Sequence, residues 1–130
     1  MAIKIRNDEG RDYMKVSEIA TILEAELLTG CENLEMDVCS ACGADLMSDV
    51  MAYVKENVVL LTGLVNPQVV RTAEMMDIKV IVFVRGKKPD EKVIEFAKEK
   101  GITIFITKHP MFIACGKLYS SGITGRGVWD

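Results

Sequence analysis

The chain has 130 residues, of which 49% are hydrophobic and 27% charged, and its formal net charge at pH 7 is −3. This length suits one domain that buries its own core. The acidic balance argues against a nucleic-acid-binding protein, in which Lys and Arg cluster on a basic domain. No apolar run approaches the roughly 20 residues of a membrane span, and the amino terminus lacks the hydrophobic core of a signal peptide. We therefore expect a cytoplasmic protein with no nucleic acid and no membrane as partner.

The first 41 residues give a mixed pattern. Residues 1–14 are polar and poorly patterned, so we expect a poorly ordered amino-terminal segment. Apolar residues at helical spacing then predict a helix, with Ser17 and Glu18 near its start as a cap and a dipole partner. Short strands are expected over 25–28 and 38–41, separated by a polar loop.

Residues 44–55 predict a second helix, because its apolar residues lie on one face. These are Leu46, Met47, Val50, Met51 and Val54. Asp45, Ser48 and Asp49 fall in its first turns, where carboxylates stabilise the helix dipole; contact with a ligand is the alternative. The chain holds eight methionines. Unbranched Met suits an adaptable core, and the alternative is an apolar association surface.

From Asn57 to Ile123, short continuous apolar runs alternate with helices that follow a proline. The runs are 58–62, 80–84 and 102–106, and the prolines stand in Asn66-Pro67, Lys88-Pro89 and His109-Pro110. The last two helices are expected over 89–100, with Gly101 as the C-cap, and over 111–120. Runs of this kind are typical of a parallel sheet that helices cover on both faces.

The expected fold class is therefore α/β, a three-layer α/β/α single domain with a mostly parallel sheet of about five strands. We place this domain at residues 15–123. The glycine-rich tail 124–130 should be flexible unless Trp129 docks on the domain.

Polar residues and glycines follow the three apolar strands. They are Thr62, Gly63 and Asn66; Arg85, Gly86, Lys87 and Lys88; and Thr107, Lys108 and His109. Because the carboxyl ends of parallel strands meet at one edge, beside helix amino termini, these residues predict an anion site for a nucleotide or phosphorylated metabolite. In the alternative, the lysines are solvated and Arg85 pairs with a surface carboxylate. His109, the only histidine, suits a capping or surface role, since acid–base chemistry would need a partner.

The four cysteines leave three interpretations open. Cys39 and Cys42 are spaced as a redox pair, with a helix dipole that would lower a thiol pKa. Cys31 and Cys115 would complete a set of ligands for zinc or an iron–sulfur cluster, although structural sites usually combine two close pairs. The third interpretation is buried small hydrophobes, which we favour, with no metal and no cofactor.

Four segments, read in order, resemble the DRTGG domain family. They are Gly43–Val50, Leu61–Gly63, Arg85–Val93 and Ile106–Phe112, and the similarity extends from about Met14 to Ile123. The chain departs from the family at Val84-Arg85-Gly86, where a Thr-Gly-Gly-like turn would be expected. It also resembles the non-catalytic amino-terminal domain of HPr kinase/phosphorylase. The resemblance implies a regulatory or ligand-sensing α/β module that is often dimeric and has no established catalytic activity.

We therefore expect a stand-alone, non-enzymatic regulatory module that works as a homodimer. The Met-rich face of helix 44–55 and the loop 62–67 are the expected dimer contacts. The alternative is an adaptor subunit of a metabolic or redox enzyme complex without a small ligand, and redox chemistry at Cys39 and Cys42 ranks last. A kinase is excluded, because neither Gly-Lys pair has the glycine and hydroxyl spacing of a P-loop.

Overall fold

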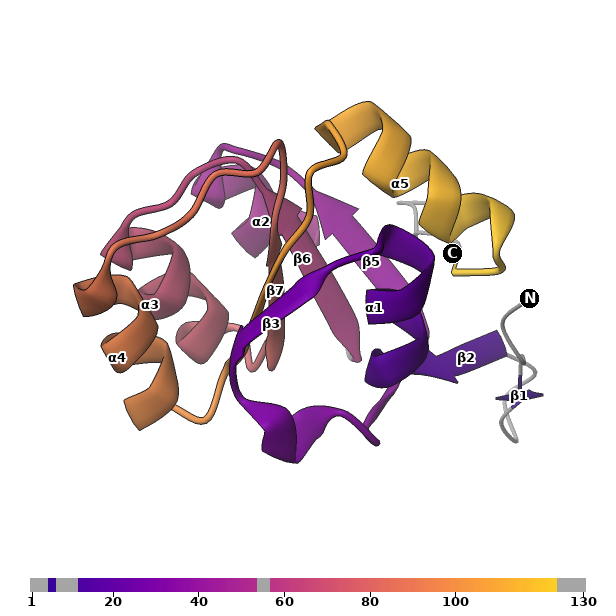
Figure 1. Cartoon of the computed structure of the whole chain (residues 1–130), viewed down its shortest axis with the longest axis horizontal. Coiled ribbons are helices and arrows are strands. Elements are labelled where there is room, and N and C mark those ends of the chain that lie inside the picture. Colours follow the sequence, from indigo (N-terminus) through magenta and orange to yellow (C-terminus); the bar gives the residue numbers. More distant parts are fainter. Residues whose placement is uncertain (1–4, 7–11, 54–56, 124–130) are drawn as a thin grey trace.

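Continuously apolar runs form the centre of a five-stranded sheet in the computed structural model, which describes residues 5–6, 12–53 and 57–123 (Figure 1). The sheet order is β3-β8-β7-β6-β5. Its strands are β3 (Glu26–Thr29), β5 (Ser40–Gly43), β6 (Val58–Thr62), β7 (Val80–Phe83) and β8 (Thr103–Ile106). The last four pair in parallel, while β3 is an edge strand antiparallel to β8. This confirms the mostly parallel sheet of five strands.

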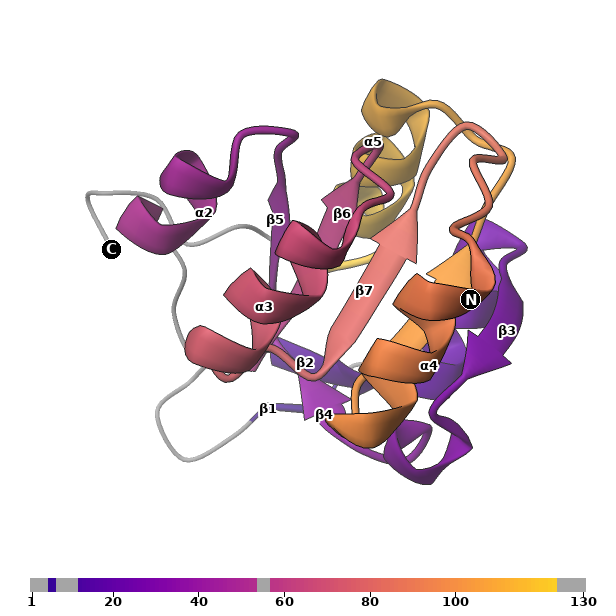
Figure 2. The ribbon, with the colours of Figure 1, turned by 90° about the vertical axis from the view of Figure 1, so that its left-hand side faces the viewer.

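Helices cover both faces of this sheet (Figures 1 and 2). They are α1 (Val16–Leu23), α2 (Met47–Tyr53), α3 (Pro67–Met75), α4 (Glu91–Glu99) and α5 (Met111–Ser120). Helices α1 and α5 pack against the face that carries Val59, Leu61 and Val82. Helices α2, α3 and α4 pack against the opposite face, with Leu60 and Ile81. Successive strand residues point to opposite faces, so one apolar run feeds both cores, and the three-layer α/β/α prediction is confirmed.

Most predicted elements are present, with shifted ends. Strand β6 and helix α5 match their predicted bounds, and α3 begins at Pro67, where the Asn66 side chain accepts a hydrogen bond from the Gln68 N–H at 3.0 Å. The prediction for the start of α4 was wrong. The helix begins at Glu91 rather than Pro89, because the Asp90 carboxylate accepts from the Val93 N–H at 3.1 Å and is the cap.

Three expectations in the first half of the chain also need correction. Lys15, not Ser17, precedes α1, and it makes no side-chain cap. The predicted strand 38–41 is divided between β4 (Asp37–Val38) and β5, which pair with different strands. The described part of the predicted helix 44–55 is α2, which begins three residues later than expected; residues 54–56 lie outside the described ranges.

A second, small antiparallel sheet has the order β1-β2-β4 and adds β1 (Ile5–Arg6) and β2 (Asp12–Lys15). Met14 in β2 is 1% exposed and packs in the core with α1 and α5, so it belongs to the domain rather than to a frayed end. Residues 1–4, 7–11 and the tail 124–130, with Trp129, lie outside the described ranges. None of the described helices is long and apolar enough to span a membrane.

Candidate functional site

The sheet has one place where connections from neighbouring strands leave in opposite directions. After β5, β6 and β7 the chain passes to α2, α3 and α4 on one face, but after β8 it passes to α5 on the other face. Open α/β sheets bind ligands outside the carboxyl ends of their strands at such a divergence. The topology therefore places the expected binding site beyond the ends of β7 and β8.

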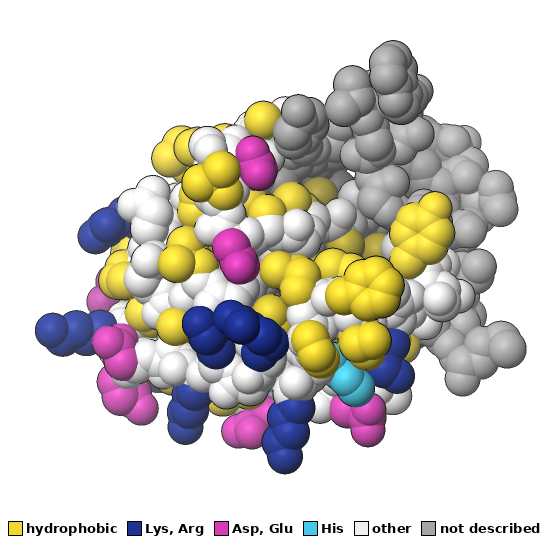
Figure 3. Space-filling view, turned by 90° about the horizontal axis from the view of Figure 1, so that it is seen from above, with side chains coloured by type: hydrophobic (Ala, Val, Ile, Leu, Met, Phe, Trp, Pro, Cys, Tyr) yellow, Lys and Arg dark blue, Asp and Glu magenta, His cyan; other side chains and the backbone are white. Residues whose placement is uncertain are grey.

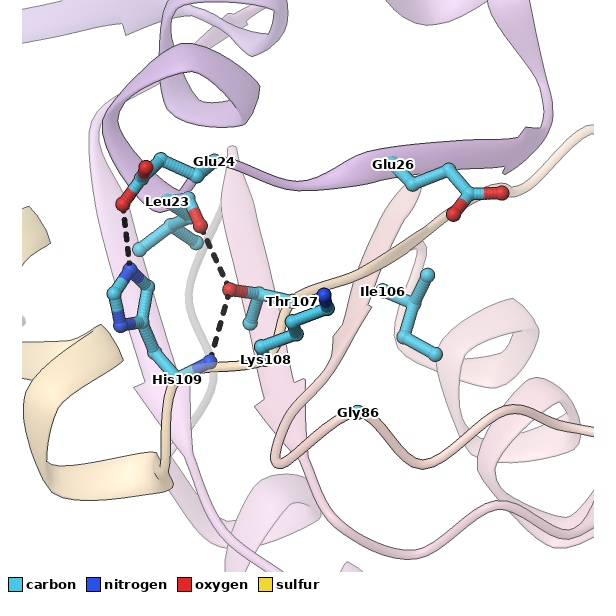
Figure 4. A pocket seen from close by; sticks show the side chains of 8 residues that line it. All are labelled: Leu23, Glu24, Glu26, Gly86, Ile106, Thr107, Lys108 and His109. Carbon is cyan, nitrogen blue, oxygen red and sulfur yellow. Dashed lines mark hydrogen bonds and ion pairs between the residues drawn. The ribbon is translucent and has the colours of Figure 1, made fainter.

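A cavity of about 470 Å³ lies at this place (Figure 4). Its walls come from three segments that are far apart in the sequence. They are the end of α1 with the start of β3 (Leu23, Glu24 and Glu26), the turn after β7 (Gly86), and the end of β8 with its loop (Ile106, Thr107, Lys108 and His109). Small-molecule sites commonly have volumes of about 300–1,000 Å³.

His109 and Glu24 close one side of the cavity. The His109 Nε2 lies 3.1 Å from the Glu24 Oε1. The capping role considered for His109 is therefore wrong, since Pro110 precedes α5 and makes no side-chain cap. Thr107 is buried, and its hydroxyl donates to the Leu23 carbonyl at 2.7 Å and accepts from the His109 N–H at 3.3 Å. Thr107 thus fastens the end of β8 to the end of α1.

The turn after β7 forms the floor of the cavity. Arg85 and Gly86 both have positive φ, at 61° and 67°, and the Lys87 N–H donates to the Val84 carbonyl at 3.3 Å, as in a type I′ turn. The Arg85 N–H donates to the His109 carbonyl and the Gly86 N–H to the Thr107 carbonyl, both at 2.8 Å. These two amides are already bonded, so an anion at this turn would meet side chains rather than backbone donors.

The end of β6 is occupied by a carboxylate of the chain itself. Asp45 Oδ1 accepts from the Gly63 N–H at 2.7 Å and from the Thr62 hydroxyl at 3.2 Å. A Cβ added to Gly63 would lie 3.4 Å from Arg85 Nη2. Thr62 and Gly63 are buried, and neither lines the cavity. Asp45 therefore anchors the loop before α2, a role that sequence reasoning did not assign to it.

The ten residues of the predicted anion site divide into three groups. Gly86, Thr107, Lys108 and His109 line the cavity. Arg85, Lys87 and Lys88 are exposed in the turn and loop that follow β7, beside Gly86. Thr62, Gly63 and Asn66 lie apart, at the end of β6 and the start of α3. Sequence reasoning missed the acidic wall, Glu24 and Glu26.

The sequence was compared with protein-family models. The model of the DRTGG domain matches residues 18–119. This chain belongs to the DRTGG domain family. The match covers all five strands of the main sheet and most of the five helices, and it confirms the resemblance that the ordered segments suggested.

A solved structure shares the fold of this DRTGG domain. It holds the CBS and DRTGG domains of the regulatory region of Clostridium perfringens pyrophosphatase, complexed with an activator, diadenosine tetraphosphate. The TM-score is 0.68 at 19% sequence identity, and the match covers 84% of this chain and 47% of that one. This chain thus spans about half the length of that structure, and the likeness establishes the fold. No curated protein sequence matches the chain at a significant level.

The surroundings of Cys42 and Cys115 in the DRTGG domain do not activate their thiols. Burial raises the pKa of the Cys42 thiol, and the neighbouring Cys115 and Asp49 raise it further. Burial also raises the pKa of Cys115. Redox-active thiols have a lowered pKa, so the shift is in the opposite direction. No disulfide joins the four cysteines, all of which lie in described segments, and no group of three or more described His, Cys, Asp or Glu side chains is placed to hold a metal.

Besides Met75 at the end of α3, which is 66% exposed, apolar side chains are exposed on two helices of the DRTGG domain. On α2 and the residue before it, Leu46 is 60% exposed and Met51 is also exposed, whereas Met47 and Val50 are buried in the core. On α5, Phe112 is 85% exposed and is joined by Ile113 and Tyr119. Seen from above, hydrophobic side chains gather beside the histidine, with Lys and Arg side chains nearby (Figure 3). The sequence pattern had indicated only the first of these two surfaces.

Proposed function

We propose that this DRTGG domain is a cytoplasmic, non-catalytic regulatory module that binds a nucleotide or another phosphorylated metabolite. The observation that carries the proposal is the cavity at the divergence of β7 and β8, next to the exposed cations Arg85, Lys87 and Lys88. The fold neighbour, a pyrophosphatase regulatory region with a DRTGG domain, is complexed with a nucleotide activator, which supports this ligand class.

The contacts around His109 support binding rather than catalysis. A histidine base needs a nucleophile or an acidic proton within hydrogen-bond reach. Thr107 supplies the hydroxyl closest in sequence, but that hydroxyl is buried and donates to the Leu23 carbonyl. The described lining of the cavity includes no Ser, Cys or Tyr. His109 instead positions Glu24 through their 3.1 Å contact.

Thermal-shift measurements with a panel of nucleotides and phosphorylated metabolites test this proposal. A ligand at about 100 times its Kd stabilises the native state by roughly 2.7 kcal/mol, which raises the Tm by several degrees. The double variant Arg85→Ala/Lys108→Ala should lose most of the shift. Lys98→Ala removes a positive charge from the last turn of α4, away from the cavity, and should leave the shift unchanged.

If the ligand-induced shift survives in the double variant, the ligand binds elsewhere and not at this edge of the sheet. No shift across the panel would remove the small-ligand proposal and favour the adaptor. The observation that speaks for an adaptor is the exposed surface of α5, Phe112, Ile113 and Tyr119, which we call the α5 patch. Large exposed apolar patches mark sites of protein association.

We also propose that the DRTGG domain is a homodimer, and that exposed Leu46 and Met51 form its contact together with the loop 62–67. Leu64 and Val65 in that loop are half-buried, so they extend the apolar surface beyond α2. The α5 patch is then left for a protein partner. The two surfaces lead to different predictions for oligomeric state.

A further inference from the structure

We call the lining of the cavity its interior and the turn after β7 its rim, and the two differ in charge. The interior has two carboxylates, Glu24 and Glu26, against the single ammonium of Lys108 and the imidazole of His109, and all of these but His109 are exposed to solvent. In the rim, Arg85 and Lys87 flank Gly86 in the chain and Lys88 follows, and all three cations are exposed. A phosphate in the interior would lie beside two like charges, which repel it, whereas the rim carries only cations. The rim therefore suits phosphates better than the interior does.

Two side chains inside the cavity have unused hydrogen-bonding capacity. Glu24 is engaged by His109. In contrast, neither Glu26 nor Lys108 has a hydrogen-bond or ion-pair partner within residues 12–53 and 57–123. Glu26 extends from β3, and Lys108 extends from the loop after β8 towards β3 (Figure 4). An ionised carboxylate only accepts hydrogen bonds and an ammonium only donates them. The interior therefore offers one acceptor and one donor beside the half-buried side chain of Ile106.

We propose that the cavity holds the base of a nucleoside diphosphate, with the phosphates outside on the turn after β7. Glu26 accepts a hydrogen bond from a donor on the edge of the base, and Lys108 donates to a neighbouring base acceptor. Ile106 contacts its apolar surface. Arg85, Lys87 and Lys88 contact the diphosphate. This inference rests on the proposed function and names the orientation and class of its ligand.

The sign of one substitution separates this orientation from the reverse one. Glu26→Gln removes a negative charge from the interior. If a phosphate entered the cavity, the loss of repulsion would tighten its binding. If a base enters, the loss of the charged acceptor weakens binding, since hydrogen bonds to charged groups are roughly twice as strong as neutral ones. Glu26 is exposed and without a described partner, so the variant should fold.

Isothermal titration calorimetry with ADP, GDP, CDP, UDP and inorganic pyrophosphate tests the inference. We expect at least one diphosphate to bind the wild type at least tenfold more tightly than pyrophosphate. Glu26→Gln should weaken that diphosphate at least threefold and leave pyrophosphate unchanged. Glu95→Gln, an equal change of charge on the exposed surface of α4, should alter neither.

Equal affinity of the wild type for pyrophosphate and all four diphosphates would overturn the inference, because the base would then contribute nothing. Tighter binding by Glu26→Gln would overturn it as well, by placing phosphate in the interior. Both results would leave the proposed function standing. Binding of none of the five probes at millimolar concentration would overturn the inference and count against nucleotide sensing itself.

Discussion

Glu24, which lines the cavity, and Arg85, in the turn after β7, adopt left-handed backbone conformations, with φ of 52° and 61°. Four described residues other than glycine have positive φ, and the other two are Asn57 and Asp77. Asn and Asp tolerate this conformation, whereas for other residues with a Cβ it costs about 1–2 kcal/mol. Strain of this kind tends to be retained where a side chain is needed for function. Glu24 contacts His109, and Arg85 is the exposed cation nearest Gly63.

Arg85→Gly should stabilise the protein and impair ligand binding. Glycine removes the strain at φ 61°, and this gain exceeds the roughly 0.5–1 kcal/mol of extra backbone entropy that glycine loses on folding. We expect the free energy of unfolding in urea to rise by up to about 1 kcal/mol. The ligand-induced thermal shift should shrink, because one rim cation is lost. A clear loss of stability would show that the Arg85 side chain supports the fold.

The cysteines should differ in reactivity, because burial raises the pKa of Cys42 and Cys115 whereas Cys31 is exposed. Alkylation requires the thiolate. Because the pKa of Cys42 and of Cys115 is raised from the ordinary value of 9.0, both thiols stay protonated to a higher pH than an ordinary cysteine does. At pH 7.5, iodoacetamide should modify exposed Cys31 first, and modification of Cys42 should accelerate only as the pH rises through 9 and beyond. Peptide mass spectrometry of timed samples measures this order. Cys42 reacting as fast as Cys31 would contradict it.

At the scale of elements, Asp45 ties the loop before α2 to the end of β6. Asp45→Ala would leave the buried Gly63 N–H and the Thr62 hydroxyl without this acceptor. An unsatisfied buried donor costs about 1–3 kcal/mol, and we expect a loss of stability of that size in urea unfolding. Asp45→Asn keeps an acceptor oxygen and should lose less. Equal losses for Ala and Asn would mean that the carboxylate charge, rather than the hydrogen bond, matters.

Gly30 allows the chain to pass close to β8 just before η1, a 3₁₀ helix over Cys31–Asn33. An added Cβ would lie 2.4 Å from the Thr103 Cα, which is backbone and cannot move aside, and Gly30 has φ 88°. Gly30→Ala should therefore cost at least about 3 kcal/mol, the upper range for single substitutions. In α5, a Cβ on Gly116 meets nothing within 4 Å, so Gly116→Ala should stabilise by about 0.5–1 kcal/mol. Urea unfolding of both variants tests the contrast.

Sequence patterns predicted the elements whose signals are local. Strand β6 is a run of buried residues, and α3 has Asn66 and Pro67 at its start, so both were placed correctly. Elements that depend on distant partners were missed or misplaced. Strands β1, β2 and β4 have two to four residues each and exist by pairing with one another, which periodicity over so short a run does not reveal. Pro89 and Asp90 are adjacent and both are typical of helix starts, and the prediction assigned the start to Pro89 although Asp90 is the cap.

At the scale of the whole molecule, half of the candidate site was predictable and half was not. Parallel strands bring their carboxyl ends to one edge, which is why Gly86, Lys108 and His109 were expected together. The antiparallel strand β3 brings its amino-terminal end to that same edge, where Glu26 pairs with Ile106. Nothing in the run 25–28 specifies its direction. The acidic wall adds negative charge to a cavity that the sequence predicted as a simple anion site. It could therefore be found only from the three-dimensional fold.

The mass of the protein in solution distinguishes a dimer contact at Leu46 and Met51 from one at the α5 patch. Analytical ultracentrifugation at about 100 μM should give twice the 14.4 kDa of the chain for the wild type. Stable interfaces bury about 800 Å² per partner around an apolar centre. Leu46→Ser/Met51→Ser should therefore give a monomer with unchanged stability, because both side chains are exposed. Phe112→Ser/Tyr119→Ser is the corresponding double substitution in the α5 patch and should leave the dimer intact. A monomeric wild type would contradict the homodimer proposal. If only Phe112→Ser/Tyr119→Ser breaks the dimer, the contact lies on α5.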